Sequence, residues 1–245
     1  MSAPTKTTTL VTIIENGLTH LVRQHVNVEP TVACLVLNGG CFVNGDETWN
    51  AAQCEVLSTD LKMITMTVNF PNTNLTEALQ ALQKAVETLR KVANQRGVMR
   101  LGVIGASSGG YLALRLAQMD NLGVEFVVAL CPVVNPMARY EYFSDECCTM
   151  ECEKRDIMLE KQLTYFESET VMTAAGDALL PRPITKVLCV FADHDENIPT
   201  FIAKTFEYQM YDHDNVTVQW LIGTHDLSHK PDSNVNATLQ AFIHC

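Results

Sequence analysis

Residues 101–117, LGVIGASSGGYLALRLA, place a short apolar run, a turn rich in glycine and serine, and an apolar segment of helical periodicity in direct succession. A short continuous apolar run that ends at a glycine is typical of a strand buried on both faces. The glycines that follow allow a tight turn from this strand into a helix. The stretch therefore predicts a β-strand followed at once by a helix, which is the unit from which α/β domains are built.

Five further apolar runs and the remaining helical patterns extend this outline. The apolar runs are 31–40, Met63–Val68, Phe126–Leu130, Val187–Ala192 and Val216–Ile222, and the predicted helices are Leu75–Val92, Gly109–Gln118, Thr200–Met210 and Val235–Ile243. Two β-rich runs within residues 8–24 flank Asn16-Gly17, a strong signal for a hairpin. Because strands that alternate with helices form parallel sheets, the sequence predicts an α/β fold. We expect a mostly parallel, doubly wound sheet with an antiparallel N-terminal hairpin.

Residues 133–183 interrupt this alternation, because they contain no strand-like run. Structureless loops of that length are uncommon in a compact domain, so we expect a helical insertion. It falls between two predicted strands, where a lid over a pocket would lie. The length of 245 residues fits one domain, and we predict a single domain over residues 1–245 with this insertion.

Composition narrows the classes of partner. The net charge of −11 makes nucleic acid an unfavourable partner, because the chain repels phosphate backbones. For the same reason acidic substrates are less favoured than neutral ones, although net charge says little about a single pocket. No apolar run approaches the ~18 residues that span a bilayer. The polar start, Met1 to Thr9, lacks a signal-peptide pattern, so we expect a cytoplasmic protein. We expect neither a metal nor a cofactor, and the sequence leaves the oligomeric state open.

Three of the nine cysteines, Cys147, Cys148 and Cys152, form a cluster. Their spacing lacks the paired C-x2-C halves of a zinc site, so surface or lid thiols are the favoured interpretation. A metal site or a redox sensor that controls the lid is the alternative.

The turn Gly105-Ala106-Ser107-Ser108-Gly109-Gly110 has the G-x-S-x-G pattern in a strand–turn–helix context, which is typical of a nucleophile elbow. Gly105 and Gly109 leave room for the sharp turn, and Ser107 is left at the end of the strand. The helix N-terminus behind it would offer free N–H groups to a developing oxyanion. The alternative is a glycine-rich turn that binds phosphate, but the G-x-G-x-x-G and Gly-Lys-Ser/Thr patterns are absent from the sequence.

A nucleophilic serine needs a base that is itself oriented by an acid, and in this kind of fold the order is Ser, then Asp, then His. The loop 193–199, DHDENIP, follows one predicted strand, and Gly223-Thr224-His225-Asp226 follows the last one. Taken singly, each could be an ordinary solvated loop. Together their order and positions favour a catalytic triad, with His229 as the competitor of His225.

Residues 37–46, LNGGCFVNGD, follow the first buried strand. Consecutive glycines such as Gly39 and Gly40 let the backbone come close to a carbonyl group and direct N–H groups toward it. With the N–H of Ser108, this loop would form an oxyanion hole. The alternative is a simple glycine turn after a strand.

These motifs together resemble the α/β-hydrolase superfamily, and within it the branch of carboxylesterases, hormone-sensitive-lipase-like enzymes and kynurenine formamidases. NGGCFVNGD is similar to H-G-G-x-[FW]-x-x-G-[DS] except at its first position, and GASSGG is similar to the G-x-S-x-G-G elbow. ADHDENIP matches the family's acid loop and GTHD its histidine turn, so the resemblance selects Asp195 and His225. It extends from about Thr31 to the C-terminus.

The resemblance implies an α/β-hydrolase fold in which Ser107 is the nucleophile, His225 the base and Asp195 the acid. It also implies oxyanion N–H groups from Gly40, Cys41 and Ser108, with Asn38 and Gly39 supporting the loop. Asn38 stands where the family has histidine, and Ala192 replaces a glycine of the acid loop. We expect these departures to modulate the site.

The function implied is hydrolysis of a small or medium acyl ester through an acyl-enzyme, with a small-molecule acyl substrate. Formamidase, amidase or thioesterase activity on the same triad is one alternative. A non-catalytic ligand-binding protein of the same fold is the other.

Overall fold

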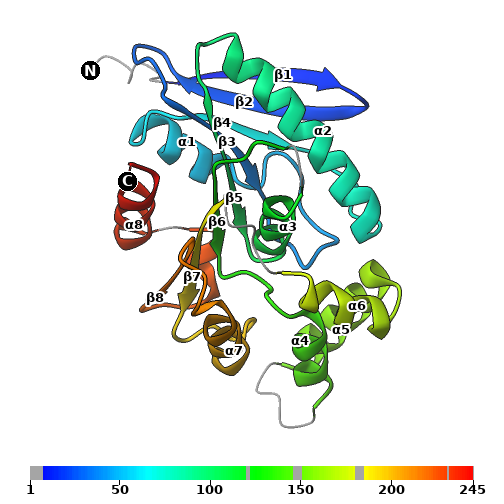
Figure 1. The fold of residues 1–245 in the computed structure, drawn as a ribbon. Coiled ribbons are helices and arrows are strands. Elements are labelled where there is room, and N and C mark those ends of the chain that lie inside the picture. Colours follow the sequence, from blue (N-terminus) through cyan, green and yellow to red (C-terminus); the bar gives the residue numbers. More distant parts are fainter. Residues whose placement is uncertain (1–7, 120–121, 146–150, 180–184, 231, 245) are drawn as a thin grey trace, which may run out of the picture.

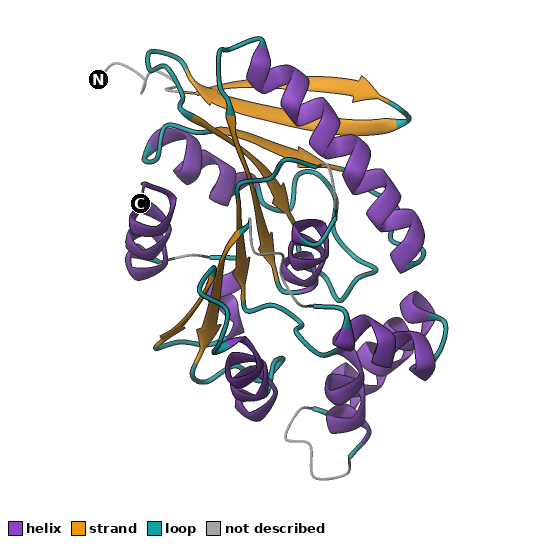
Figure 2. Ribbon diagram, viewed as in Figure 1, coloured by secondary structure: helices purple, strands orange, loops and turns teal. Residues whose placement is uncertain are grey.

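An eight-stranded sheet with helices on both faces forms the centre of the computed structural model (Figures 1 and 2). The structure describes residues 8–119, 122–145, 151–179, 185–230 and 232–244. The strands are β1 (Thr8–Glu15), β2 (Leu18–His25), β3 (Val32–Leu37), β4 (Ile64–Val68), β5 (Arg100–Ala106), β6 (Phe126–Leu130), β7 (Lys186–Ala192) and β8 (Val216–Leu221). The helices are α1 (Ala51–Thr59), α2 (Leu75–Asn94), α3 (Ser108–Ala117), α4 (Pro136–Ser144), α5 (Cys152–Phe166), α6 (Glu169–Asp177), α7 (Thr200–Met210) and α8 (Ser233–His244), with a 3-10 helix η1 (His225–Ser228).

The strand order is β1-β2-β4-β3-β5-β6-β7-β8. From β4 to β8 every neighbouring pair is parallel, whereas β1 pairs antiparallel with β2, and β2 with β4. The carboxyl ends of β3, β5, β6, β7 and β8 therefore meet at one edge of the sheet, where ligand sites of open α/β sheets are found. The predicted class, a mostly parallel doubly wound sheet, is confirmed.

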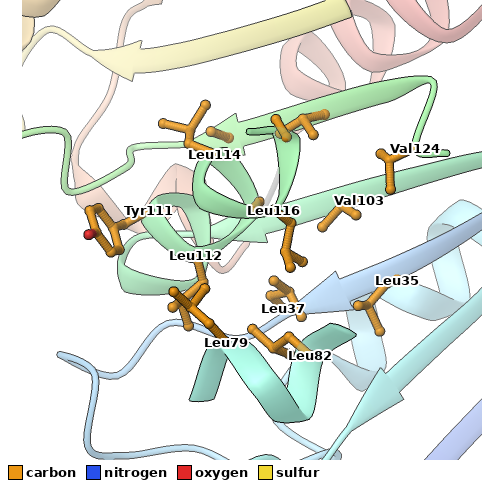
Figure 3. Close-up of a cluster of buried hydrophobic side chains, with 14 of the residues drawn as sticks. Leu35, Leu37, Leu79, Leu82, Val103, Tyr111, Leu112, Leu114, Leu116 and Val124 are labelled. Carbon is orange, nitrogen blue, oxygen red and sulfur yellow. The ribbon is translucent and has the colours of Figure 1, made fainter. Parts of the chain in front are cut away.

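The two faces of the sheet explain the uninterrupted apolar runs. Along β3, Ala33, Leu35 and Leu37 belong to the core beneath α2, α3 and α7, while Cys34 and Val36 belong to the core beneath α1 and α8. Figure 3 shows Leu37 of β3 among leucines from α2 and α3. Since side chains alternate between covered faces, every residue of the strand is apolar and buried.

The predicted hairpin is present at one edge of the sheet. Asn16 and Gly17 both have positive φ, 54° and 77°, as the two central residues of a type I′ turn require. The turn joins β1 to β2 in the register that pairs Glu15 with Leu18.

The predicted helical insertion is also confirmed, as α4, α5 and α6 between β6 and β7. These helices lie together to one side of the sheet (Figure 1). Asn135 and Ser168 cap α4 and α6 through their side chains. Cys152 is the exposed first residue of α5, whereas Cys147 and Cys148 lie outside the described residues.

Helix α1 was not predicted. Its N-cap Asn50 makes no side-chain capping bond, and its buried side chains mix polar Gln53 and Ser58 with apolar Cys54 and Leu57. A helix without an apolar stripe or a cap has no periodic signal in the sequence. Among the described residues, no helix is both long and apolar enough to cross a membrane.

Candidate active site

Ser107 lies in the turn between β5 and α3 with backbone angles that few residues adopt, φ 54° and ψ −117°. Hydrogen bonds hold it there. Its N–H donates to Leu130 O over 2.8 Å, and its carbonyl accepts from the N–H groups of Tyr111 and Val133 over 3.2 and 3.3 Å. Such strain persists only where the surroundings enforce it, and it is concentrated at functional sites.

The two glycines that flank Ser107 are there because larger residues would not fit. A Cβ on Gly105 would collide with the carbonyl oxygen of Gly109, and a Cβ on Gly109 would collide with the carbonyl oxygens of Leu37 and Asn38. The elbow therefore packs directly against the loop that follows β3. This is the crowding that the G-x-S-x-G pattern predicts.

The structure brings Ser107, His225 and Asp195 together at the carboxyl ends of β5, β8 and β7. His225 Nε2 lies 2.9 Å from Ser107 Oγ, and His225 Nδ1 lies 2.8 Å from Asp195 Oδ2. The His225 side chain is 12% exposed and that of Asp195 only 2%. A continuous hydrogen-bonded chain thus runs from a nearly buried carboxylate to the serine oxygen.

Asp195 is held in place by its own loop and by the strand beside it. Its Oδ1 accepts hydrogen bonds from the N–H groups of Asn197 and Ile198 over 2.8 and 2.9 Å. The buried thiol of Cys131, just after β6, lies beside Asp195, and burial raises the pKa of this thiol. The side-chain ligand atoms of Cys131, Asp195 and His225 lie within 4.8 Å of one another. The hydrogen bond between Asp195 and His225 holds two of these groups together, and burial favours the uncharged form of the third, the Cys131 thiol.

Asp193, the other aspartate of the loop, occupies a different position. Its Oδ1 accepts the N–H of Gly223 over 2.9 Å, so it ties the acid loop to the turn that leads to His225. That turn is fixed further on by Ser228, whose Oγ donates to His225 O over 2.7 Å.

The loop after β3 has an unusual backbone beside the elbow. Gly40, Cys41 and Phe42 all have positive φ, 112°, 55° and 71°. The buried Asn38 amide donates to Gly39 O over 2.8 Å and to Asn44 O over 3.2 Å, so it bridges the two sides of the loop. Within the described part of the chain, the N–H groups of Gly40 and Cys41 make no backbone hydrogen bond. These are two of the three N–H groups that the sequence predicts as oxyanion donors.

His229, the competing histidine, does not take the place of His225. Its ring lies edge-on to that of His225, with centroids 5.9 Å apart, and it contacts the loop where a Cβ on Gly39 would stand. Burial lowers the pKa of His229, and the neighbouring His225 lowers it further. His229 therefore packs against the loop as a largely neutral side chain.

Sequence reasoning did not single out Cys131 or Arg139. In the sequence, Cys131 is a small residue at the end of an apolar run, and Arg139 is one of several charged residues in the predicted insertion. The Arg139 side chain is fully buried, and its Nε donates to Asn197 O, two residues beyond Asp195, over 2.9 Å. No local pattern marks either residue, because their contacts come from distant parts of the chain.

Comparison with known proteins agrees with this fold. A family model described as alpha/beta hydrolase fold matches residues 34–208. The fold is similar to that of a thermostable carboxylesterase cloned from a metagenomic library, with a TM-score of 0.76 and 22% identity over 98% of this chain and 87% of the other. It is also similar to a hyperthermophilic esterase from the archaeon Pyrobaculum calidifontis, with a TM-score of 0.74 and 18% identity over 97% and 84% of the two chains.

A third similar structure is a brefeldin A esterase, a bacterial homologue of human hormone-sensitive lipase. It has a TM-score of 0.73 and 16% identity over 98% of this chain and 77% of the other. At these identities the solved structures establish the shared fold. A search of curated protein sequences found no significant match.

Proposed function

Since the chain belongs to the alpha/beta hydrolase fold family, we propose that it is a serine hydrolase that cleaves a small or medium acyl ester through an acyl-enzyme. The observation that carries the proposal is the hydrogen-bonded chain from Asp195 through His225 to Ser107, at a strained elbow. A serine oxygen aligned with a histidine nitrogen in this way is activated for nucleophilic attack.

In the proposed reaction, Ser107 Oγ attacks the ester carbonyl carbon while its proton passes to His225 Nε2. The carbonyl oxygen becomes an oxyanion, which accepts hydrogen bonds from the N–H groups of Gly40, Cys41 and Ser108. The tetrahedral intermediate then breaks its bond to the alcohol oxygen, and His225 returns the proton to this leaving group. Water attacks the acyl-enzyme by the same route, which releases the acid and restores Ser107.

Asp195 acts by holding the imidazole. When its carboxylate accepts a hydrogen bond from the N–H at His225 Nδ1, the lone pair of Nε2 faces Ser107, which is the tautomer that a base needs. The two backbone N–H donors keep the carboxylate oriented, and the buried Cys131 thiol lies beside it. Helix α3, which begins at Ser108, adds the positive end of its dipole beneath the oxyanion.

A fluorophosphonate probe tests the proposal, because it labels a serine only where base and oxyanion donors act together. We expect one label per chain by intact-protein mass spectrometry, and none in the Ser107→Ala variant. Hydrolysis of 4-nitrophenyl esters of two to twelve carbons should fall on the order of 10⁵-fold in that variant, because only binding and the oxyanion donors remain. The preferred chain length would give the size of the acyl pocket.

The alternatives give different results in the same assay. Labelling with poor ester turnover but fast cleavage of formanilides or acyl thioesters would assign a formamidase or a thioesterase. A folded protein that takes up no label would contradict the proposal and point to a ligand-binding role.

The proposal includes a cytoplasmic location. The described cysteines Cys34, Cys41, Cys54, Cys131, Cys152 and Cys189 are all free, which supports a reducing compartment. Cell fractionation with an antibody against the protein checks it, and recovery outside the cytoplasmic fraction would contradict it.

A further inference from the structure

Arg139 of α4 is a buried cation whose hydrogen-bond partners are all neutral. Its guanidinium donates to Asn197 O over 2.9 Å and to Gln162 Oε1, and it lies 4.8 Å from the centre of the Phe143 ring. Burial lowers the pKa of the guanidinium, and the negative charge of Asp195 opposes this effect from beyond ion-pair distance. Buried charges are normally paired directly, so the field of this one also reaches the space around it.

A pocket of about 290 Å³ lies next to this cation. Three of the residues around Arg139, namely Cys41, Met158 and Asn197, form part of the pocket wall. The guanidinium thus lies directly behind the wall, where its charge is poorly screened by water.

The side chains that line the pocket add more positive charge. Lys154 and Lys161 of α5 contribute two ammonium groups, and Glu196 is the one acidic residue of the lining. With Arg139 behind the wall, there are three cations against two carboxylates, Glu196 on the wall and Asp195 behind it. This local excess contrasts with the chain as a whole, which carries a net charge of −11.

The pocket also adjoins the candidate active site. Cys41 belongs to the loop that would bind the oxyanion, and Asn197 donates its N–H to Asp195. Lys161 Nζ reaches the same loop, since it lies 2.7 Å from the Asn44 side-chain oxygen with the amide oriented to accept the hydrogen bond. A group bound in this pocket would therefore be attached close to the scissile carbonyl.

We propose that this pocket selects esters that carry a carboxylate, with Lys154 and Lys161 as the groups that meet it and Arg139 as the buried charge that reinforces them. The inference rests on the proposed ester hydrolysis and names the substrate class. It departs from the expectation that net charge alone suggests, because clefts respond to the charges that line them.

Matched pairs of substrates test this selection. One series consists of mono-4-nitrophenyl esters of adipic, suberic and sebacic acid, each compared with the same ester whose free end is a carboxamide. A second pair, 6-acetoxyhexanoate and 6-acetoxyhexanamide, places the carboxylate on the alcohol side. We expect kcat/KM to favour the carboxylate over the carboxamide about tenfold in one of the series, mostly through KM, and the preference to shrink at high salt.

Variants link the preference to the pocket. Lys154→Met and Lys161→Met should each lower the carboxylate-to-carboxamide ratio about two- to fivefold, and Lys154→Glu should lower it further. Lys84→Met removes the same charge from the exposed face of α2 and should leave the ratio unchanged. Arg139→Gln should also lower the ratio. The lysine variants decide the matter if Arg139→Gln does not fold.

The outcomes separate this inference from the function on which it rests. Ratios near one for all pairs, with the carboxamide esters still hydrolysed, would overturn the carboxylate selection alone. A ratio that falls equally in Lys84→Met would overturn the assignment to this pocket. Failure of Ser107 to take up the fluorophosphonate label would overturn the proposed function and this inference with it.

Discussion

Asp193 and Asp195, two positions apart, contact the segment that carries His225 in different ways. Asp195 bonds to the imidazole itself, whereas Asp193 bonds to the backbone N–H of Gly223. The first contact sets the tautomer of His225, and the second sets the position of its loop. A carboxylate is required for the first role, while any oxygen acceptor serves the second.

Asp195→Asn should therefore lower kcat on the order of 10⁴-fold, because an amide in that position can donate its own proton to Nδ1 and stabilise the wrong tautomer. Asp193→Asn keeps an oxygen for the N–H of Gly223 and should lower kcat less than about tenfold. Steady-state kinetics on one 4-nitrophenyl ester, with thermal unfolding as the check on folding, compares the two. The opposite ranking would assign the role of acid to Asp193.

At the scale of elements, an aromatic cluster connects the insertion to the loop after β3. Phe42 of that loop stacks on Tyr165 of α5, with centroids 4.9 Å apart. It also meets two rings edge-on, those of Phe166 of α5 and Tyr111 of α3. All four side chains are buried. The insertion and the loop that would bind the oxyanion thus share one packed core, so their positions depend on each other.

The two tyrosines of this cluster provide a matched pair. The Tyr111 hydroxyl accepts from Arg115 over 2.8 Å and lies 3.4 Å from Ala175 O, whereas the Tyr165 hydroxyl has no hydrogen-bond partner among the described residues. Tyr111→Phe should lower the free energy of unfolding by about 1 kcal/mol, and Tyr165→Phe should leave it unchanged or raise it by a similar amount. Chemical denaturation measures both. Equal losses would mean that the Tyr165 hydroxyl does find a partner.

At the scale of the whole molecule, buried histidines link stability to pH. His20 of β2 is fully buried with its Nδ1 3.4 Å from Ile13 O. Burial lowers its pKa, against smaller opposing effects of the Ile13 carbonyl and of Glu15. His229 is shifted in the same direction. The unfolded chain takes up these protons at about pH 6.5, whereas the folded chain does so only at lower pH. The free energy of unfolding should therefore fall as the pH drops below about 6.5.

His20→Leu should remove part of this dependence. Denaturation at pH 7.5 and 5.5 would show a smaller difference between the two values than in the unaltered protein, and His25→Gln, near the open end of the hairpin, serves as the control. An identical pH dependence in His20→Leu would exclude His20 as a source of the effect.

The sequence predicted the parts of this molecule that local patterns encode. Ser107 and Asp195 follow buried strands, and His225 follows the last strand of the sheet, each within a segment of recognisable composition. The family resemblance then selected Asp195 over Asp193. Helix α1 could not be predicted, because its buried face mixes Gln53 with Leu57. The surroundings of Arg139 could not either, since Asn197 and Gln162 reach it from two other segments. Pairing of distant segments is set by tertiary packing, which no local period reports.

The positions of the three proposed catalytic residues along the chain have a consequence for biosynthesis. Ser107 and His225 are 118 positions apart, and the histidine follows the last strand of the sheet. Translation therefore delivers the nucleophile and the loop after β3 long before the base. A nascent chain on the ribosome can shape the elbow around Ser107, yet it has nothing to accept the serine proton until β8 has joined β7 and η1 has formed. The proposed chemistry is thus withheld from unfinished polypeptides and begins only when synthesis of the sheet is complete.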